Sequence, residues 1–379
     1  MDSAWRLWSE RNRFGLYKHN GPTLPRYMNA VVYNIHGEAD VLEDCRMETP
    51  VITRPKKILI RTEHASINPA DIKLRYGIMA NFNRTIFPQI PGQDLSGVVV
   101  DSSSEKFKPG DRVMGCNLNG GAAAEYAIFR EEHLARVPDQ MSSAEAACLP
   151  TVGLTAYQTL VEYGKIDKTK RVLVLGGAGG VGSYTVQYCK KVLNAEVHAT
   201  CSTYNKDFVL GLGASQVYDH SDPNYHEKIF DSYDLIIDTA GKDGTYKKLL
   251  KTLVKKNGSF VKVGIHKELY STYDALMDIV TSLYHSTVST VLLKPKYKWF
   301  VLSLDDPRQL EIVAHQHLKH KLSTYISRYY PLNATNLQLA HKIIELGHTR
   351  GKLLMQVQPL LSEKESYLTN TFLKLNQNK

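Results

Sequence analysis

The sequence predicts an α/β protein in which a doubly wound parallel sheet adjoins a second, mainly β domain. From about residue 153 onward, short apolar runs typical of strands alternate with helical patterns, as in a parallel sheet. From Met28 to about residue 150, strand-like runs instead follow one another across turns. The chain has 379 residues, more than the roughly 250 to 300 that one hydrophobic core accommodates, so two domains are expected.

Residues 1–26 form an N-terminal extension of different character. Its Trp and Leu side chains are interleaved with Arg and Lys, as in a mitochondrial presequence, which predicts a mitochondrial matrix protein. Asp2 and Glu10 do not fit that pattern, so the alternative is a simple extension on a cytoplasmic protein. No run of the sequence approaches the roughly 18 apolar residues that cross a bilayer, and no membrane span is expected.

The first domain, residues 27–150, is predicted to contain mainly strands. Strand-like runs occupy residues 30–33, 57–61, 96–100 and 124–128, and a turn at residues 108–111 leads into a further strand. Asp94 lies in a predicted turn after Gly92, where a carboxylate accepts backbone N–H groups and fixes the loop. Residues 299–359 are expected to return to this domain, and residues 360–379 to form a mobile tail.

A glycine cluster follows the first strand of the second domain, residues 151–298. The apolar run 171–175 is typical of a buried parallel strand, and the stretch 183–193 is compatible with a helix. Between them, glycines allow a sharp turn and a close approach to a pyrophosphate, which the helix N-terminus stabilises. A turn without a ligand is the alternative, but the flanking strand and helix favour a dinucleotide site. The expected contacts are Gly177, Gly179, Gly180, Val181 and Gly182.

The end of the next strand, residues 196–200, indicates which dinucleotide binds. A site that prefers NADH usually carries Asp or Glu there, whereas this chain has Ser202, Thr203 and Lys206. Hydroxyl groups and an ammonium can receive a 2′-phosphate, so NADPH is the predicted cofactor. The alternative is that Lys206 is an ordinary solvated residue at the start of a helix.

Three further strands are predicted at residues 216–218, 234–238 and 258–264. Thr239 and Gly264 stand at the carboxyl ends of the last two, where a ligand crevice opens in such sheets. Both are expected to contact the cofactor. Near the end of the chain, a helix is predicted around residues 337–346 and a strand at residues 353–357.

Charge and cysteine content exclude several classes of protein. The net charge of +9 comes from short, dispersed basic clusters without an RNA-recognition motif or zinc-finger spacing, so no sequence-specific nucleic-acid partner is expected. The five cysteines are scattered without a Cys-x-x-Cys pair, which argues against a disulfide framework and a four-cysteine zinc lobe. A buried, inert thiol is expected for Cys148.

Four motifs and a C-terminal ending together resemble one family over about residues 28–358. The chain is similar to medium-chain dehydrogenase/reductases of the zinc-free quinone oxidoreductase type, and within them to mitochondrial reticulon-interacting oxidoreductases. The resemblance implies a Rossmann sheet and a GroES-like catalytic domain. The motifs lie at residues 68–77, 91–99, 109–113 and 149–157, and the ending at residues 347–352.

The resemblance also implies site residues. It places Asn68 and Thr155 beside the nicotinamide and His220 near an adenosine phosphate. Arg350, near the end of the chain, is expected to complete the phosphate pocket from the other domain. An exposed turn histidine and a surface charge are the respective alternatives. Zinc-bearing relatives carry a Cys near the Asn68 position and Gly-His-Glu where this chain has Gly-Gln-Asp at residues 92–94, so no metal is expected.

Lys73 is the candidate proton donor, because many relatives carry a Tyr at its position. Its ammonium could hold a developing enolate, and ready proton release at neutral pH would need its pKa lowered by about three units from roughly 10.4. The alternative is that Lys73 and Arg75 are exposed helix residues, or that one pairs with Asp71. Tyr76 is a second candidate donor, with a packed loop aromatic as its alternative.

Together these patterns predict an NADPH-dependent, zinc-independent oxidoreductase that transfers hydride to a quinone or another conjugated carbonyl compound. The alternatives are an enoyl thioester reductase and a non-catalytic NADPH-binding interaction protein. Substrate specificity is expected to lie in loops at residues 78–87 and 267–290. The resemblance also suggests a homodimer formed through the edge of the nucleotide-binding sheet.

Overall fold

The computed structural model describes most of the chain between residues 24 and 357. Outside the description lie residues 1–23, 79–84, 223, 230–231, 242–248, 250–251, 265–279, 282, 285, 288–295, 348 and 358–379. The predictions for the N-terminal extension, for the tail and for most of the two specificity loops therefore fall outside the described residues.

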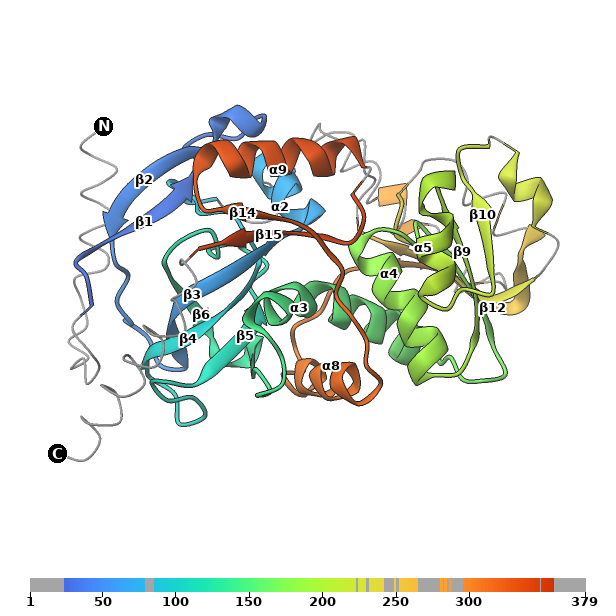
Figure 1. Cartoon of the computed structure of the whole chain (residues 1–379), viewed down its shortest axis with the longest axis horizontal. Coiled ribbons are helices and arrows are strands. Elements are labelled where there is room, and N and C mark those ends of the chain that lie inside the picture. The colour runs from blue at the N-terminus through green and yellow to red at the C-terminus, as the bar shows by residue number, and fades with distance from the viewer. Residues whose placement is uncertain are drawn as a thin grey trace.

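The first part of the chain folds into two β-sheets, on the left of Figure 1. β1 (Tyr27–Val32) and β2 (Glu43–Glu48) form an antiparallel pair. The larger sheet has the order β14-β15-β3-β4-β5-β7, and β6 pairs with β3. Its strands are β3 (Lys57–Ile67), β4 (Asp94–Ser102), β5 (Arg112–Cys116), β6 (Tyr126–Arg130), β7 (Leu134–Arg136), β14 (Ile326–Pro331) and β15 (Lys352–Gln356). Thus two strands from near the end of the chain complete the sheet of the first domain.

The core of this domain lies between the large sheet and the helix α9 (Ala334–Leu346), which lies above β14 and β15 in Figure 1. β3 is buried along most of its length, because β4, β6 and β15 all pair with it. From α9, Leu337 and Ala340 pack against the same core as Leu95 and Leu353. The sequence predicted only the first five residues of β3, since a strand buried on both faces shows no alternation of polar and apolar side chains.

The second part of the chain forms a six-stranded parallel sheet with the order β10-β9-β8-β11-β12-β13. Its strands are β8 (Arg171–Leu175), β9 (Glu196–Cys201), β10 (Gln216–Asp219), β11 (Tyr233–Asp238), β12 (Val254–Val263) and β13 (Lys296–Phe300). The order reverses between β8 and β11, and in such sheets ligands bind in the crevice at that point. The α/β fold class predicted from the sequence is confirmed.

Two helices connect the domains. α3 (Ser143–Tyr157) packs against β4 of the first domain and against α4 (Gly180–Gln187) of the second. α8 (Arg308–Lys319) lies under α3 in Figure 1, and its His317 Nε2 is 2.9 Å from Glu145 Oε1 of α3. The expected domain boundaries at residues 150/151 and 298/299 fall inside α3 and β13, so the two domains share elements that are continuous across those positions.

Candidate active site

The glycine cluster forms the turn between β8 and α4. β8 ends at Leu175, the chain passes through Gly176 at φ +85°, and α4 begins at Gly180 with Gly179 as its N-terminal cap. The left-handed conformation of Gly176 favours glycine. Because the first N–H groups of a helix have no partner inside it, this end of α4 is suited to hold an anion.

Close packing requires two of the predicted glycines. A Cβ on Gly182 would lie 2.1 Å from the carbonyl oxygen of Gly176, and a Cβ on Gly177 would lie 2.8 Å from the Cβ of Ala199. At Gly179 the nearest atom to such a Cβ is 3.6 Å away. The turn therefore combines a close contact between helix and strand with room for a Cβ in ordinary contact at the helix cap, an arrangement that fits the pyrophosphate of a dinucleotide. Val181 lies in the first turn of α4, between these glycines.

The turn after β9, residues 202–206, meets Arg350 from the far end of the chain. The Arg350 Nε donates a hydrogen bond to Asn205 Oδ1 at 2.8 Å. Its guanidinium lies 4.9 Å from the centre of the Tyr204 ring and 5.0 Å from that of Phe208. The fold thus brings the cation of Arg350 to the turn that carries Ser202, Thr203 and Lys206, the three predicted contacts of a 2′-phosphate.

An acidic side chain lies at the same turn. The Thr203 hydroxyl donates a hydrogen bond to Asp219, at the end of β10, and this bond is the main reason that the pKa of Asp219 lies below its usual range. The backbone N–H of the neighbouring His220 donates a hydrogen bond to the carbonyl of Cys201 at 3.0 Å. The choice of NADPH was predicted from the end of β9 alone. Parallel pairing of β10 with β9 also places Asp219 opposite Cys201, and so brings a carboxylate to the same turn. A 2′-phosphate bound here would have a carboxylate near it.

Thr239 and Gly264 follow β11 and β12 at the carboxyl edge of the sheet. The Thr239 hydroxyl donates to the carbonyl of Leu175 at 2.7 Å, so it lies directly beside the glycine turn. Gly264 has φ +71°, and among the described residues no atom lies within 4 Å of the place where its Cβ would be. Its carbonyl accepts a hydrogen bond from the Trp299 ring at 2.9 Å. Both predicted residues therefore border the crevice of the sheet.

Asn68 belongs to a buried polar group where the two domains meet. It caps α2 (Pro69–Arg75), and its Nδ2 donates to Asp94 Oδ2 at 2.9 Å. Asp94 is 0% exposed and also accepts hydrogen bonds from Ser66 Oγ at 3.2 Å and Thr151 Oγ1 at 2.7 Å. The prediction that Asp94 fixes a turn through backbone N–H groups is wrong, because Asp94 begins β4 and its partners are side chains from neighbouring elements.

Lys352 completes this group. No role was predicted for it from the sequence. Its side chain is buried, and its Nζ donates to the carbonyl of Ile67 at 3.0 Å and to Asn68 Oδ1. The same Nζ lies 3.9 Å from Asp94 Oδ2, so a buried cation faces a buried carboxylate. The pairing joins residues 284 positions apart in the sequence, and no local pattern could have indicated it.

The backbone before Lys352 is attached to the glycine turn. The N–H of Gly351 donates to the carbonyl of Ala178 at 2.8 Å, and Gly351 forms an isolated parallel bridge with Gly179. Residues 350–352, which we call the strap, therefore contact three places in succession. These are the turn after β9, the glycine turn and the buried group around Asn68.

Asp71 adds a second buried carboxyl beside this group. Its Oδ2 accepts the backbone N–H of Asn68 at 2.8 Å, and its Oδ1 has no hydrogen-bond partner among the described residues. Burial, and then the negative charge of Asp94, raise the pKa of Asp71 to about 7, although the Asn68 N–H and the charge of Lys352 act in the opposite direction. Asp71 therefore changes charge near neutral pH.

Thr155 lies in α3 one turn after Thr151 and is buried. Because residues four apart share a helix face, Thr155 lies on the side of α3 that faces the buried group around Asn68. Cys116 Sγ is 3.5 Å from Thr151 Oγ1, and burial holds the pKa of this thiol well above its usual value. Burial likewise raises the pKa of Cys148 to about 12, consistent with the expected inert thiol.

Lys73 and Tyr76 lie at the C-terminal end of α2, at the opposite end from Asn68. Lys73 is in the last turn and is half-buried, and Tyr76 caps the helix. The Arg75 guanidinium lies 4.5 Å from the centre of the Tyr76 ring, and burial and the charge of Glu345 raise the pKa of Tyr76. The surroundings of Tyr76 are thus the contact between α2 and α9.

Arg75 itself is fully buried. Its Nε donates to the carbonyl of Gly37 at 3.0 Å, its Nη1 lies 3.1 Å from His341 Nδ1, and its Nη2 pairs with Glu345 at 2.5 Å. Burial lowers the pKa of His341 to about 3, so its neutral ring accepts a hydrogen bond from Arg75. For Arg75, the interpretation as an exposed helix residue or a partner of Asp71 is therefore wrong. It joins α2 to α9.

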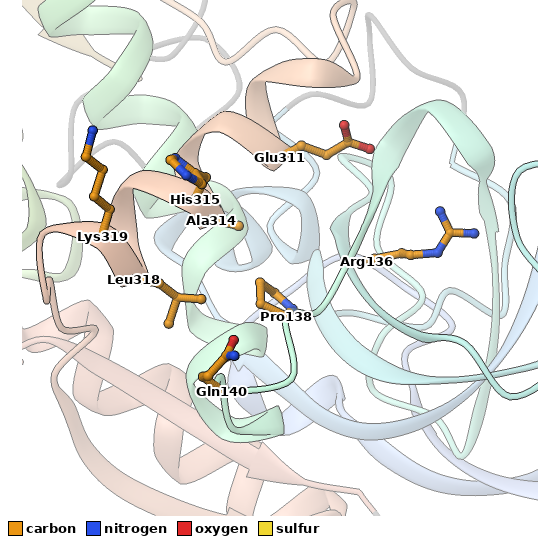
Figure 2. Close-up of a pocket in the computed structure, with 8 residues that line it drawn as sticks. All are labelled: Arg136, Pro138, Gln140, Glu311, Ala314, His315, Leu318 and Lys319. Carbon is orange, nitrogen blue, oxygen red and sulfur yellow. The ribbon is translucent and has the colours of Figure 1, made fainter.

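A surface pocket of about 760 Å³ lies elsewhere, between α8 and the segment after β7 (Figure 2). Arg136 and Pro138 line one side and His315 and Leu318 the other. No residue of the glycine turn or of the buried group around Asn68 lines this pocket. The candidate active site is therefore not this pocket but the region where the glycine turn meets the buried group around Asn68.

Two family models match the chain. Residues 54–139 match the alcohol dehydrogenase GroES-like domain, and residues 212–355 match the zinc-binding dehydrogenase domain. A chloroplast envelope quinone oxidoreductase homolog of Arabidopsis thaliana is 30% identical over 344 residues, which are 87% of this chain and 99% of that protein. The chain belongs to the medium-chain dehydrogenase/reductase superfamily.

Other members of this superfamily agree. The mitochondrial NAD(P)H oxidoreductase RTN4IP1 of Bos taurus is 29% identical over 365 residues, covering 88% of this chain and 91% of that protein. The structure of the quinone oxidoreductase from Coxiella burnetii superposes with a TM-score of 0.73 and 26% identity, covering 88% of this chain and 100% of that chain. The expected likeness to quinone oxidoreductases and to mitochondrial reticulon-interacting oxidoreductases is confirmed.

The chain is therefore a quinone oxidoreductase-like enzyme that uses a nicotinamide cofactor. Relatives named as mitochondrial and relatives named as chloroplast proteins both occur. Among the helices that the structure describes, none has the length and apolar character of a membrane span.

One matching family is named for zinc binding. The side chains of this chain do not fit a zinc site. Where the resemblance leads one to expect the zinc ligands, this chain has the amides of Asn68 and Gln93, and Gln93 Nε2 donates a hydrogen bond to the carbonyl of Leu118 at 2.9 Å. The Asp94 carboxylate already accepts three hydrogen bonds and faces the Lys352 ammonium. In the described part of the chain, no three His, Cys, Asp or Glu side chains form a group that could hold a metal. No step below uses a metal.

Proposed function

We propose that this enzyme is an NADPH-dependent, zinc-independent reductase that transfers hydride to a quinone or another conjugated carbonyl compound. The observation that carries this proposal is the buried group of Asn68, Asp94 and Lys352 beside the glycine turn, because its side chains hold one another through hydrogen bonds and an ion pair and offer amide and ammonium donors rather than metal ligands. The names of the Arabidopsis and Coxiella relatives support a quinone as the acceptor.

The proposed cofactor contacts follow the path of the crevice. The 2′-phosphate end is held by the turn after β9, with His220 and Arg350 at its sides, and the pyrophosphate by the glycine turn. Asn68 and Thr155 serve the nicotinamide end. The full set is Asn68, Thr155, Gly177, Gly179, Gly180, Val181, Gly182, Ser202, Thr203, Lys206, His220, Thr239, Gly264 and Arg350.

The proposed reaction consists of one hydride transfer and one proton transfer to the acceptor. When bound, NADPH supplies a hydride from C4 of its nicotinamide ring to an electron-poor carbon of the acceptor. The chain's part is to exclude water and to donate hydrogen bonds to the acceptor oxygen, on which negative charge develops. Lys73 is the proposed source of the proton that this oxygen then receives, and Tyr76 is the alternative source.

The decisive experiment measures NADPH oxidation with ubiquinone analogues, simple quinones, conjugated ketones and enoyl-CoA esters. Turnover with quinones or conjugated ketones is the expected result. Turnover confined to enoyl-CoA esters would instead identify an enoyl thioester reductase. Tight NADPH binding without turnover on any acceptor would indicate an interaction protein and overturn the proposal.

Cofactor preference has its own test at Asp219. We expect the wild-type protein to bind NADPH more tightly than NADH, and Asp219→Asn to strengthen NADPH binding further by roughly fourfold. The reason is that two like charges about 5 Å apart in water repel by about 0.8 kcal/mol. NADH binding should stay the same. Titration by fluorescence measures both, with Asp167→Asn, before β8 and far from the turn after β9, as the control.

Location and assembly extend the proposal. The relative named as mitochondrial and the basic N-terminal extension support a mitochondrial matrix enzyme. Among the strands that the structure describes, β13 lies at one edge of the parallel sheet, and we propose this edge as the surface of a homodimer. Fractionation of cells that express the tagged full chain, and light scattering of the purified protein, test these two points.

A further inference from the structure

The register of three neighbouring strands brings Lys352, Asn68 and Asp94 to one end of the large sheet. β15 pairs antiparallel with β3, with Leu353 opposite Ile67, so the next positions are Lys352 and Asn68. β4 pairs with β3 on its other side, with Asp94 opposite Ser66. Lys352 and Asp94 begin β15 and β4, and Asn68 directly follows β3 as the cap of α2, so strand pairing holds the backbone beside all three side chains.

This arrangement decides which way the Asn68 amide points. An ammonium can only donate hydrogen bonds and a carboxylate can only accept them. Lys352 Nζ donates to Asn68 Oδ1, and Asn68 Nδ2 donates to Asp94 Oδ2 at 2.9 Å. A flipped amide would set its NH₂ against the ammonium and its oxygen against the carboxylate. An amide nitrogen carries two hydrogens, of which the bond to Asp94 uses one, so Asn68 Nδ2 has a second hydrogen with which to meet a ligand.

The same lysine links the amide to the glycine turn. A Cβ on Gly180 would lie 2.9 Å from Lys352 Cδ, so the lysine stem passes directly against the start of α4. The N–H of Gly351, one residue earlier, donates to the carbonyl of Ala178 at 2.8 Å. The Asn68 amide is therefore held at a set place relative to the turn that binds the pyrophosphate.

We propose that Lys352 is a positioning residue, whose ammonium orients the Asn68 amide so that an Asn68 N–H is presented to the nicotinamide end of the cofactor. This inference rests on the proposed function for its nicotinamide cofactor and deepens it. Lys352 moves no proton and touches no reacting atom. Its effect on turnover passes through the direction of one amide.

A simpler role is that Lys352 only balances the charge of Asp94, and paired variants separate the two roles. Lys352→Met leaves a buried carboxylate without a cation, so this variant is expected to melt at lower temperature. The double variant Lys352→Met/Asp94→Asn removes both charges and should recover most of the lost thermal stability. Lys352→Arg keeps the donor and the charge and serves as the conservative rescue.

The binding measurement compares NADPH with 2′-phospho-ADP-ribose, which lacks the nicotinamide. In the stable double variant we expect NADPH to bind at least fivefold more weakly, with binding of the fragment changed less than twofold. Lys352→Arg should restore much of the difference. Equal loss for both ligands, or no loss for either, would show that Lys352 is merely structural. This measurement does not depend on turnover, so it stands even if no acceptor is reduced.

The kinetic measurement uses whichever acceptor the panel identifies. We expect kcat in the double variant to fall at least tenfold, with KM for the acceptor changed less than threefold. The isotope effect with NADPH deuterated at C4 should rise, because a misplaced amide slows hydride transfer itself. A double variant with wild-type kcat would refute the inference while leaving the proposed reaction intact. Absence of turnover in the wild-type protein would refute the proposed reaction instead.

Discussion

At the scale of single residues, the glycine turn separates the needs of folding from those of binding. Gly182 cannot carry a Cβ without a clash with the backbone of Gly176, whereas Gly179 has space for one. Both glycines lie in the same short motif, and a pattern of glycines alone cannot tell these roles apart. The difference becomes visible only when the helix is packed on the strand.

Two alanine variants are therefore expected to behave differently. Gly182→Ala should lower the free energy of unfolding by about 1–3 kcal/mol, because the backbone must shift, and should also weaken NADPH binding. Gly179→Ala should leave the melting temperature close to wild type but weaken NADPH binding, since its methyl group occupies space at the helix cap. Calorimetry and fluorescence titration measure the two effects. Equal stability of the two variants would contradict this account of Gly182.

Asp71 makes stability depend on pH. Its pKa is about 7 in the folded protein and about 3.8 in the unfolded chain, so the folded state binds more protons between these values. Stability attributable to Asp71 is therefore full below about pH 4 and falls as the pH rises to 7. From pH 5 to pH 8, Asp71→Asn should gain about 2–3 kcal/mol in free energy of unfolding relative to wild type.

Urea unfolding at several pH values tests this prediction. The exposed Asp40 provides a control, and Asp40→Asn should follow the wild-type curve. If the wild-type and Asp71→Asn curves run parallel from pH 5 to pH 8, then the Asp71 carboxyl does not titrate as its burial implies.

At the scale of elements, strands with a clear pattern of apolar residues were predicted well. Strands made mainly of polar residues were not. The run 171–175 matches β8, and the helix expected at 337–346 lies within α9. β2 was missed because only Cys45 and Met47 of its residues are apolar, a pattern too short to predict a strand, and β14 is likewise largely exposed. Periodicity reports burial of one face, so a short strand with few apolar side chains leaves little trace in the sequence.

The contact between α2 and α9 depends on the buried guanidinium of Arg75. Replacing it, as in Arg75→Met, would leave the carboxylate of Glu345 and the ring of His341 without their donor. We expect the free energy of unfolding to fall by about 3 kcal/mol. The exposed Arg328 is the control, and Arg328→Met should change it by less than about 0.5 kcal/mol. Similar unfolding curves for the two variants would show that Arg75 does not hold these helices together.

At the scale of the whole molecule, α3 and the strap both connect the two domains. The strap contacts both ends of the proposed cofactor path, so a bound dinucleotide would stabilise both domains at once. We therefore expect one cooperative thermal transition rather than two.

Cofactor binding should raise the temperature of that transition. NADPH at 100 times its Kd adds about 2.7 kcal/mol to the free energy of unfolding, which corresponds to a rise of roughly 4 °C in Tm for a chain of this size. Differential scanning calorimetry measures the shift, with NADH at the same concentration as the comparison. Two resolved transitions, of which only one responds to NADPH, would show that the strap does not couple the domains.

The sequence by itself determined the parallel sheet, the glycine turn and the class of cofactor, because apolar periodicity and glycine spacing act over a few neighbouring residues. Tertiary structure alone decided what surrounds the cofactor path. Lys352 meets Asn68 across 284 positions through the pairing of β15 with β3, and Asp219 reaches Thr203 through the pairing of β10 with β9. Register between strands distant in sequence sets both contacts, and register arises from the packing of the whole sheet, which no local pattern contains.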